Sequence, residues 1–280
     1  MDTPRSLAYL GPMGTFSEMA ATAAGDATTS YLPLTSMPAV ITAVETRAAA
    51  AGILPIENSL EGGVSATLDA LIHETNLRIC REIVLPIRHM LACRPGLTLP
   101  EIELLYSHQQ PLAQSRRFVQ RVLPGIPTVA SLSTAAALQD ALTNSRPAAA
   151  LTTLHAAERA EATILAHDVQ DNNNNRTRFV VLRHTDAAPT GDDKTSLMFT
   201  VHINRSGALV EALNIFAHAN INLTKIESRP AKAELGEYVF LVDVEGHRTD
   251  ARIAVALHEL GRTAALVKVF GSYPAWRGIG

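Results

Sequence analysis

Short apolar runs alternate with helical patterns along the first part of the chain. The apolar run 6–10 ends at a glycine-rich turn, and the capping-box spacing of Thr15 and Glu18 predicts a helix through about Ala24. The alternation continues with strands over 51–59, 102–108 and 148–153 and helices over 36–50, 64–74, 111–123 and 133–142. This order predicts an α/β fold with a mostly parallel sheet.

The run 77–94 is too long and too rich in β-branched residues for one ordinary strand, and Pro86 interrupts it. We interpret it as a strand that crosses from one lobe into a second. Ligands of such sheets bind beyond the carboxyl ends of the strands. Polar clusters follow or adjoin the apolar strands at 11–17, 55–59, 107–110, 132–134 and 172–179. These clusters form the candidate site.

A polar stretch, 183–196, contains proline, glycine and three aspartates and is the best candidate for a linker. The helix predicted after it, 207–219, has the core-facing spacing of an amphipathic helix. The order beyond the linker is strand, helix, strand, strand, helix, strand, over 196–203, 207–219, 223–230, 237–244, 250–260 and 265–273. This is the order of a ferredoxin-like module.

The composition narrows the class of protein. The 280 residues are 47% apolar and 18% charged, which is ample for hydrophobic cores, and the net charge of -3 argues against nucleic acid as a partner. Cys80 and Cys93 are expected to be reduced core thiols. We find no signal peptide and no apolar run of about 18 residues, so we expect a cytoplasmic protein without membrane contact.

The strongest local signal is the segment in which Arg176, Thr177 and Arg178 follow four asparagines and precede the apolar run Phe179–Leu182. Asparagine tolerates left-handed backbone angles, so the tract is typical of a shaped loop. Guanidinium groups bind carboxylates in a bidentate manner, and a hydroxyl between two of them suits a bound dianion. The alternative, a solvated basic loop, is disfavoured by the buried strand that follows directly. No metal-ligand cluster stands out, so we predict a small anionic ligand and no metal.

Each of the other polar clusters has an ordinary structural alternative. Gly11 and Gly14 before a helix would bring the backbone close to an anion, yet short glycine turns are common. The stretch 55–59 fits a helix cap as well as a site, and His108 has no second histidine at metal-ligand spacing. Ser133 and Thr134 are typical of an N-cap, which also binds carboxylates.

Taken together, these stretches resemble the prephenate dehydratase family over essentially the whole chain. The stretch 11–17 is similar to the family's opening motif, 54–64 to its second motif, and 172–179 to its Thr-Arg-Phe motif. Residues 107–114 resemble its Ser-His-Pro-Gln stretch, with Gln109 in place of the usual proline. Several individually weak motifs in the family's order make a strong joint signal.

The C-terminal module resembles an ACT regulatory domain. Its 205–213 is similar to the Gly-Ala-Leu ligand motif, with Ser206 in place of the common proline, and 223–230 is similar to the Glu-Ser-Arg-Pro motif. The resemblance implies a two-lobed catalytic domain like a type II periplasmic binding protein over 1–185 (lobes of about 1–85 plus 160–185, and 86–159), a linker over 186–194, and a ferredoxin-like ACT domain over 195–275.

The resemblance implies a cofactor-free reaction in which prephenate loses water and carbon dioxide and becomes phenylpyruvate, on the route to phenylalanine. Thr177 would assist the departing hydroxyl. A tight ion pair on the ring carboxylate would stabilise the ground state, so Arg178 should serve the side-chain carboxylate or order the loop. The implied catalytic residues are Thr177, Arg178 and Phe179, and the implied substrate-binding residues are Thr15, Phe16, Ser17, Glu57, Asn58, Ser59, Ser107, His108, Gln109, Ser133, Thr134 and Asn174.

The ACT resemblance implies L-phenylalanine as an allosteric effector and assembly into a homodimer or homotetramer. The implied effector-binding residues are Asn204, Gly207, Ala208, Leu209, Glu227, Ser228, Arg229 and Pro230. Two alternatives stay open: arogenate dehydratase, whose substrate differs by an amino group, and a non-catalytic binding or sensor protein for small anions. A prephenate decarboxylase without dehydration is disfavoured because Thr177 is retained.

Overall fold

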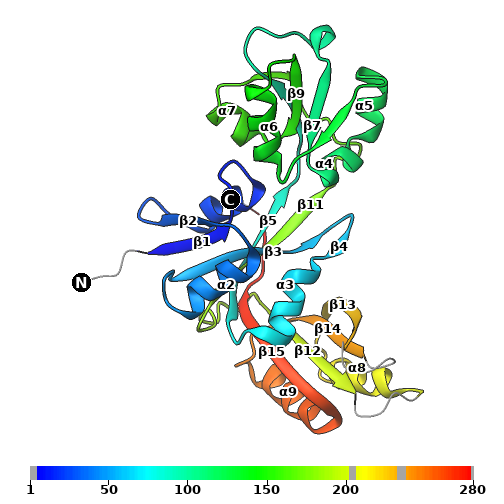
Figure 1. The fold of residues 1–280 in the computed structure, drawn as a ribbon. Coiled ribbons are helices and arrows are strands. Elements are labelled where there is room, and N and C mark those ends of the chain that lie inside the picture. Colours follow the sequence, from blue (N-terminus) through cyan, green and yellow to red (C-terminus); the bar gives the residue numbers. More distant parts are fainter. Residues whose placement is uncertain (1–4, 202–205, 232–237, 279–280) are drawn as a thin grey trace.

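The chain forms a two-lobed α/β part followed by a smaller α+β module (Figure 1). A computed structural model describes residues 5–201, 206–231 and 238–278. In these residues the strands make three sheets, one in each lobe and one in the C-terminal module. No helix among them is long and apolar enough to cross a membrane.

The sheet of the first lobe has the order β2-β1-β3-β11-β5, and β4 pairs with β3. β1 is parallel to β2 and β3, whereas β11 is antiparallel to β3 and β5. The sheet is mixed instead of mostly parallel, because the chain leaves the lobe along β5 and returns along β11. Its elements are β1 (Ser6–Leu10), α1 (Phe16–Ala24), β2 (Ser30–Leu34), α2 (Met37–Glu45), β3 (Ala51–Asn58), β4 (Gly62–Gly63), α3 (Ser65–Asp69), the π-helical turn η1 (Ala70–Glu74), β5 (Arg78–Pro86) and β11 (Arg176–Arg183).

The sheet of the second lobe has the order β10-β6-β9-β7-β8 and is also mixed. β10 pairs with β6, so the lobe boundary predicted near residue 160 is wrong and the chain stays in the second lobe through Ala166. The predicted helix 111–123 is divided at Ser115. The elements are β6 (Met90–Cys93), the 3-10 turn η2 (Leu99–Glu101), β7 (Leu104–Ser107), α4 (Gln109–Gln114), α5 (Arg116–Val122), β8 (Thr128–Ala130), α6 (Thr134–Thr143), β9 (Ala148–Thr152), α7 (Leu154–Arg159) and β10 (Thr163–Ala166).

Two neighbouring segments connect the lobes. Figure 1 shows β5 and β11 side by side where the first lobe meets the second; β5 runs toward the second lobe and β11 runs back from it. Beyond them the backbone N–H of Ile87 donates to the carbonyl of Asn175 at 2.9 Å, and Val169 N–H donates to the carbonyl of His89 at 2.9 Å. The crossing segments therefore support each other, and residues on them lie between the lobes.

The C-terminal module has the predicted order β12 (Asp193–Val201), α8 (Ala208–His218), β13 (Leu223–Pro230), β14 (Tyr238–Glu245), α9 (Ala251–Thr263) and β15 (Ala264–Pro274). Its antiparallel sheet has the order β13-β14-β12-β15. Phe216 of α8 and Leu260 of α9 pack on one face of this sheet, around Phe199. The ferredoxin-like order predicted from the sequence is thus confirmed.

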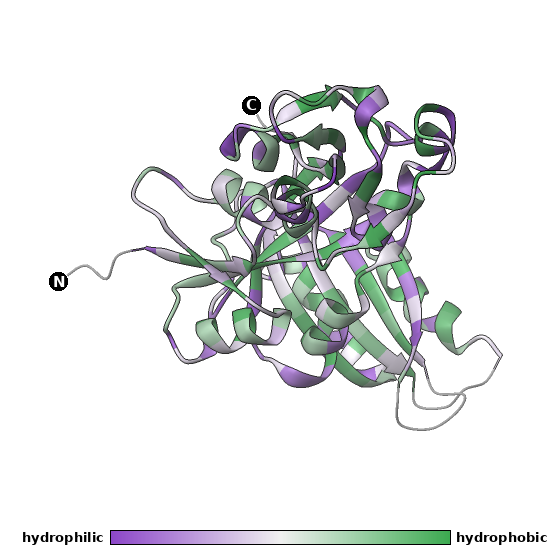
Figure 2. Cartoon of the chain, turned by 45° about the horizontal axis from the view of Figure 1, so that its top comes forward, coloured by the Kyte–Doolittle hydropathy of each residue, from purple (hydrophilic) through white to green (hydrophobic). Residues whose placement is uncertain are grey.

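The other face of the module's sheet is docked on the first lobe. Met198 and Leu241 share a hydrophobic core with Leu71 and Ile79 of the first lobe. A Cβ at Gly271 of β15 would lie 2.2 Å from the carbonyl oxygen of Ile79, so the two backbones approach to a distance that only glycine allows. Figure 2 shows hydrophobic residues concentrated along the strands. The module and the first lobe are therefore joined by an extensive apolar contact.

Candidate active site

The start of β11 lies beside the end of β3, where the first lobe faces the second. Because the two strands are antiparallel, Thr177 is paired with Asn58. Both side chains are buried, and Asn58 Nδ2 lies 2.9 Å from Thr177 Oγ1. Two residues that are 119 positions apart in the sequence thus form one hydrogen-bonded pair.

The direction of this hydrogen bond is fixed by the backbone around Asn58. Its Oδ1 accepts from the N–H groups of Leu60, at 3.0 Å, and Glu61, at 3.2 Å, so Nδ2 must be the atom that faces Thr177. Thr177 Oγ1 is therefore the acceptor, and its own proton is left to donate elsewhere. A hydroxyl held in this way is suited to donate a hydrogen bond to a bound ligand.

A chain of amides continues from this pair into the second lobe. Asn58 Nδ2 also donates to Asn175 Oδ1 at 2.9 Å, and Asn175 Nδ2 donates to Gln114 Oε1 at 2.9 Å. Gln114 Nε2 donates to Glu61 Oε1 at 2.9 Å, which fixes the orientation of the Gln114 amide. Gln114 belongs to α4 in the second lobe, so the chain holds the two lobes together at the candidate site.

His89 closes the chain at the segment that connects the lobes. Its Nε2 lies 3.1 Å from Gln114 Oε1, and because that oxygen only accepts, we assign the ring proton to Nε2. His89 is buried, and burial lowers the pKa of its ring below the usual value. Its Nδ1 has no hydrogen-bond partner in the part of the chain that the structure describes. The lining next to Thr177 is therefore made of neutral polar groups.

The glycine-rich loop before α1 does not offer its backbone to a ligand in the way the sequence predicts. Thr15 caps α1, but the N–H of Gly14 donates to Glu18 Oε2 at 2.5 Å. The carboxylate of Glu18 thus fills the anion position, and it also lies 3.2 Å from His155 Nε2 of the second lobe. The predicted ligand anion at this helix end is replaced by a side chain of the protein.

Most of the other predicted binding residues lie around the same region but serve the local structure. His108 caps α4, Ser133 caps α6, and Ser59 Oγ accepts from the N–H of Arg176 at 2.9 Å. The ring of Phe16 contacts that of His89 edge to face, with centroids 5.8 Å apart. Buried positions are also held by Ser17, Ser107 and Thr134, while Gln109 begins α4. Their contact with substrate stays a prediction.

Asn174 is exposed, whereas its neighbour Asn175 is almost fully buried and bonded to Asn58. Asn175, and not the predicted Asn174, therefore joins the chain of amides beside Thr177. Strand alternation offered the signal that was missed, because residues 175 and 177 are two apart and face the same side. Gln114 belongs to the stretch 107–114 that resembles a family motif, but it was not predicted as a site residue. Nothing in the sequence indicated His89.

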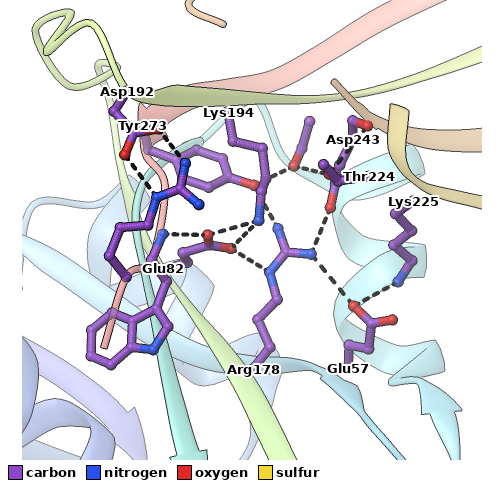
Figure 3. Close-up of polar contacts among 12 residues, drawn as sticks. Glu57, Glu82, Arg178, Asp192, Lys194, Thr224, Lys225, Asp243 and Tyr273 are labelled. Carbon is purple, nitrogen blue, oxygen red and sulfur yellow. Dashed lines mark hydrogen bonds and ion pairs between the residues drawn. The ribbon is translucent and has the colours of Figure 1, made fainter. Parts of the chain in front are cut away.

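Arg178 and Phe179 were predicted to be catalytic residues together with Thr177, but their side chains do not lie beside its hydroxyl. Phe179 is part of the hydrophobic core of the first lobe and supports the strand. Arg178 faces the opposite side of the sheet from Thr177, where its Nη1 lies 2.6 Å from Asp243 Oδ2 of the C-terminal module (Figure 3). Its guanidinium is thus bound to the protein's own carboxylates. Of its two predicted roles, this geometry does not support contact with a substrate carboxylate, whereas ordering of the loop stays a prediction.

The predicted effector residues fall into two groups. Gly207 is the N-cap of α8 with φ of 86°, as expected for a position that favours glycine, and Ala208 and Leu209 form the first turn of the helix. Glu227 and Arg229 face the first lobe of the same chain, where Arg229 Nη2 donates to the carbonyl of Gly63 at 3.2 Å. Ser228 and Pro230 are exposed, and Asn204 lies outside the described residues. The side chains of Glu227 and Arg229 therefore contact the first lobe of the same chain.

No three histidine, cysteine, aspartate or glutamate side chains in residues 5–201, 206–231 and 238–278 gather as ligands for a metal ion. The fold and the site define a two-lobed α/β domain with a buried hydroxyl between the lobes, joined to a ferredoxin-like module. Two family models match the chain, "Prephenate dehydratase" over residues 7–187 and "ACT domain" over residues 195–262. The chain belongs to the prephenate dehydratase family.

Individual relatives are similar over nearly the whole chain. The prephenate dehydratase of Mycolicibacterium gilvum is 39% identical over 281 residues, which cover 96% of this chain and 90% of the relative. The solved prephenate dehydratase of Arthrobacter aurescens, in complex with L-Phe, is 38% identical with a TM-score of 0.88 and covers 96% of this chain and 90% of its own. GqqA, described as a novel type of quorum quenching acylase, is 32% identical with a TM-score of 0.86 and covers 98% and 99%.

Proposed function

We propose that this enzyme converts prephenate to phenylpyruvate and that L-phenylalanine inhibits it through the ACT domain. The observation that carries the proposal is the hydrogen bond from Asn58 Nδ2 to Thr177 Oγ1, which leaves the hydroxyl proton of Thr177 free to donate. In the reaction the bond between the ring and its hydroxyl breaks, and the oxygen gains negative charge. A donor aimed at that oxygen stabilises the transition state more than the ground state.

The rest of the reaction needs little from the protein. The bond to the ring carboxylate breaks, its electron pair enters the ring as carbon dioxide leaves, and the departing oxygen takes up one proton and leaves as water. Aromatisation supplies the driving force. The neutral lining of Asn58, Asn175, Gln114 and His89 suits this step, because a tight ion pair would hold the ring carboxylate in its charged ground state. Ser133 and Thr134, at the start of α6, are the proposed anchor for the other carboxylate.

The direct test follows the absorbance of phenylpyruvate after purified protein is mixed with prephenate. Arogenate should be tested in parallel, because it differs from prephenate only by an amino group on the side chain. Acylase activity should be assayed as well, since a relative of the same fold carries that description. Turnover of prephenate with the higher kcat/KM supports the proposal, and turnover of arogenate or an acyl substrate alone would contradict it.

The inhibition by phenylalanine predicts a specific effect of Gly207→Val. The backbone at Gly207 has φ of 86°, which a β-branched residue adopts only with strain, so the start of α8 would shift. We expect the variant to bind phenylalanine at least about tenfold more weakly, equivalent to about 1.4 kcal/mol, and to escape inhibition. Gly96→Val is the matched control, because Gly96 has φ of 89° but lies in the second lobe. Equal binding of phenylalanine by all three proteins, measured by calorimetry, would refute this site.

A closed assembly of at least two subunits is also proposed. Large apolar side chains are exposed on the ACT domain, including Val210, Ile226 and Leu266 at 59%, 50% and 53% of their surface. These side chains lie on α8 and on the two edge strands of the sheet, β13 and β15, so they offer apolar surface to a second subunit, and a two-fold dimer is the commonest solution. Sedimentation at micromolar concentration should give a dimer or tetramer. A stable monomer under these conditions would rule the assembly out.

A further inference from the structure

The strands that carry the catalytic pair present their neighbouring residues to the ACT domain. Thr177 pairs with Asn58, and the next pair along the two strands is Arg178 with Glu57. Because side chains alternate across a sheet, Arg178 and Glu57 emerge on the face opposite to Thr177. That face is covered by the sheet of the ACT domain, so the two domains meet directly behind the catalytic pair.

The guanidinium of Arg178 is the centre of the polar contact between the domains (Figure 3). Its Nη1 donates to Asp243 Oδ2 at 2.6 Å, and its Nη2 donates to the hydroxyl of Tyr273 at 2.6 Å. In the catalytic domain, Arg178 Nε lies 2.6 Å from Glu82 Oε2, in an ion pair whose geometry does not meet that of a hydrogen bond. Arg178 is therefore held between carboxylates of two different domains.

Asp243 is itself rigidly placed. It belongs to β14, an inner strand of the ACT sheet, and Ser196 Oγ donates to its Oδ1 at 2.5 Å. The hydroxyls of Ser196 and Tyr273 also lie 2.5 Å apart, so Arg178, Asp243, Ser196 and Tyr273 form a closed ring of contacts. On the neighbouring strand β13, Lys225 is paired with Asp243. A displacement of β13, which contains the proposed effector motif, would therefore also displace Asp243.

We propose that Asp243 of the ACT domain is a positioning residue for Thr177 and acts through Arg178. The inference rests on the proposed function and adds to it a residue from outside the catalytic domain. Thr177 and Arg178 are adjacent in β11, so anchoring of the guanidinium at Asp243 limits movement of the strand segment that carries the hydroxyl of Thr177. A small displacement of that hydroxyl weakens the donation to the departing oxygen without removing any substrate contact.

The test is Asp243→Asn in the full chain, assayed with prephenate. Asparagine keeps the shape and a partner for Ser196 but loses the charge that holds Arg178. We expect kcat to fall roughly tenfold, less than the factor of about 10² that a 1 Å misplacement causes, with KM within about twofold of the parent value. Inhibition by phenylalanine should weaken in the same variant.

Lys268→Met is the matched control, because it also removes a contact between the domains. Lys268 Nζ donates to the carbonyl groups of Ile72, at 3.2 Å, and Thr75, at 2.8 Å, away from β11. We expect this variant to keep the parent kcat. A parent-like kcat in Asp243→Asn, or an equal loss in both variants, would overturn the positioning role while leaving the proposed function intact.

Hydrogen exchange gives a second readout that does not need activity. Peptides that contain Thr177 and Asn58 should exchange faster in Asp243→Asn than in the parent, and not in Lys268→Met. If the parent does not turn over prephenate, the proposed function is wrong. The hydrogen-exchange rates of these two peptides then test the positioning role on their own. Unchanged exchange of both peptides would then overturn it.

Discussion

Replacing Thr177 by valine is expected to lower kcat for prephenate by a factor on the order of 10² or more. Valine keeps the size of the side chain, but it cannot donate a hydrogen bond to the departing oxygen. Preorganised donors of this kind account for about 10² to 10³ in kcat in other enzymes. KM should change little, because the interaction strengthens only as charge develops. Steady-state kinetics on the two proteins measures the effect.

Thr177→Ser is the control for this result. Serine retains the hydroxyl and can accept the same hydrogen bond from Asn58 Nδ2, so we expect it to keep most of the activity. Loss of fold is not the expected cause of a low kcat in the valine variant, because Asn58 Nδ2 still has Asn175 Oδ1 as a partner. One lost hydrogen bond costs about 1 kcal/mol, which thermal unfolding would detect. Near-normal turnover by Thr177→Val would remove this hydroxyl from the mechanism.

The order of strands and helices was largely predictable, because it depends on local periodicity and caps. Thr15 and Ser133 each accept a hydrogen bond from the first turn of a helix, as their positions in the sequence predict. The direction of strand pairing was not predictable in the same way. β11 lies between β3 and β5 because the chain returns from the second lobe, and no local pattern reports that pairing.

The sequence predicted those site residues that a local motif identifies. It did not predict contacts that depend on which distant residues the fold brings together. Thr177 and Asn58 were selected from separate motifs, and the structure brings them to 2.9 Å. Arg178 was expected to serve a substrate carboxylate or to order the loop, because guanidinium groups bind carboxylates. One of the carboxylates that it binds belongs to Asp243, 65 residues later, in a domain that the sequence could not place against β11.

Replacing Arg178 by glutamine is expected to destabilise the folded protein by about 3–5 kcal/mol, because removing one partner of a buried ion pair leaves the other charge uncompensated. Asp243 and Glu82 are both almost fully buried, and Glu82 keeps a second cation, since Lys194 Nζ lies 2.8 Å from its Oε1. The orphaned group is therefore Asp243. Asp243→Asn should be less harmful in the Arg178→Gln background than in the parent, which chemical denaturation of the four proteins would show as non-additivity. Additive losses would contradict the pairing.

The pH dependence of the same variants tests the charge directly. In the parent, burial would raise the pKa of Asp243, but Arg178 and Ser196 hold it below its ordinary value. Its contribution to stability is thus present above the unfolded pKa of about 3.9 and is lost as pH falls through the lower folded pKa. Without Arg178, burial dominates and the folded pKa rises above the unfolded one, so the penalty is full at neutral pH and disappears as pH falls toward about 4. The difference in unfolding free energy between parent and Arg178→Gln should therefore shrink between neutral pH and about pH 4, and it should stay constant if Asp243 is not the group that Arg178 neutralises.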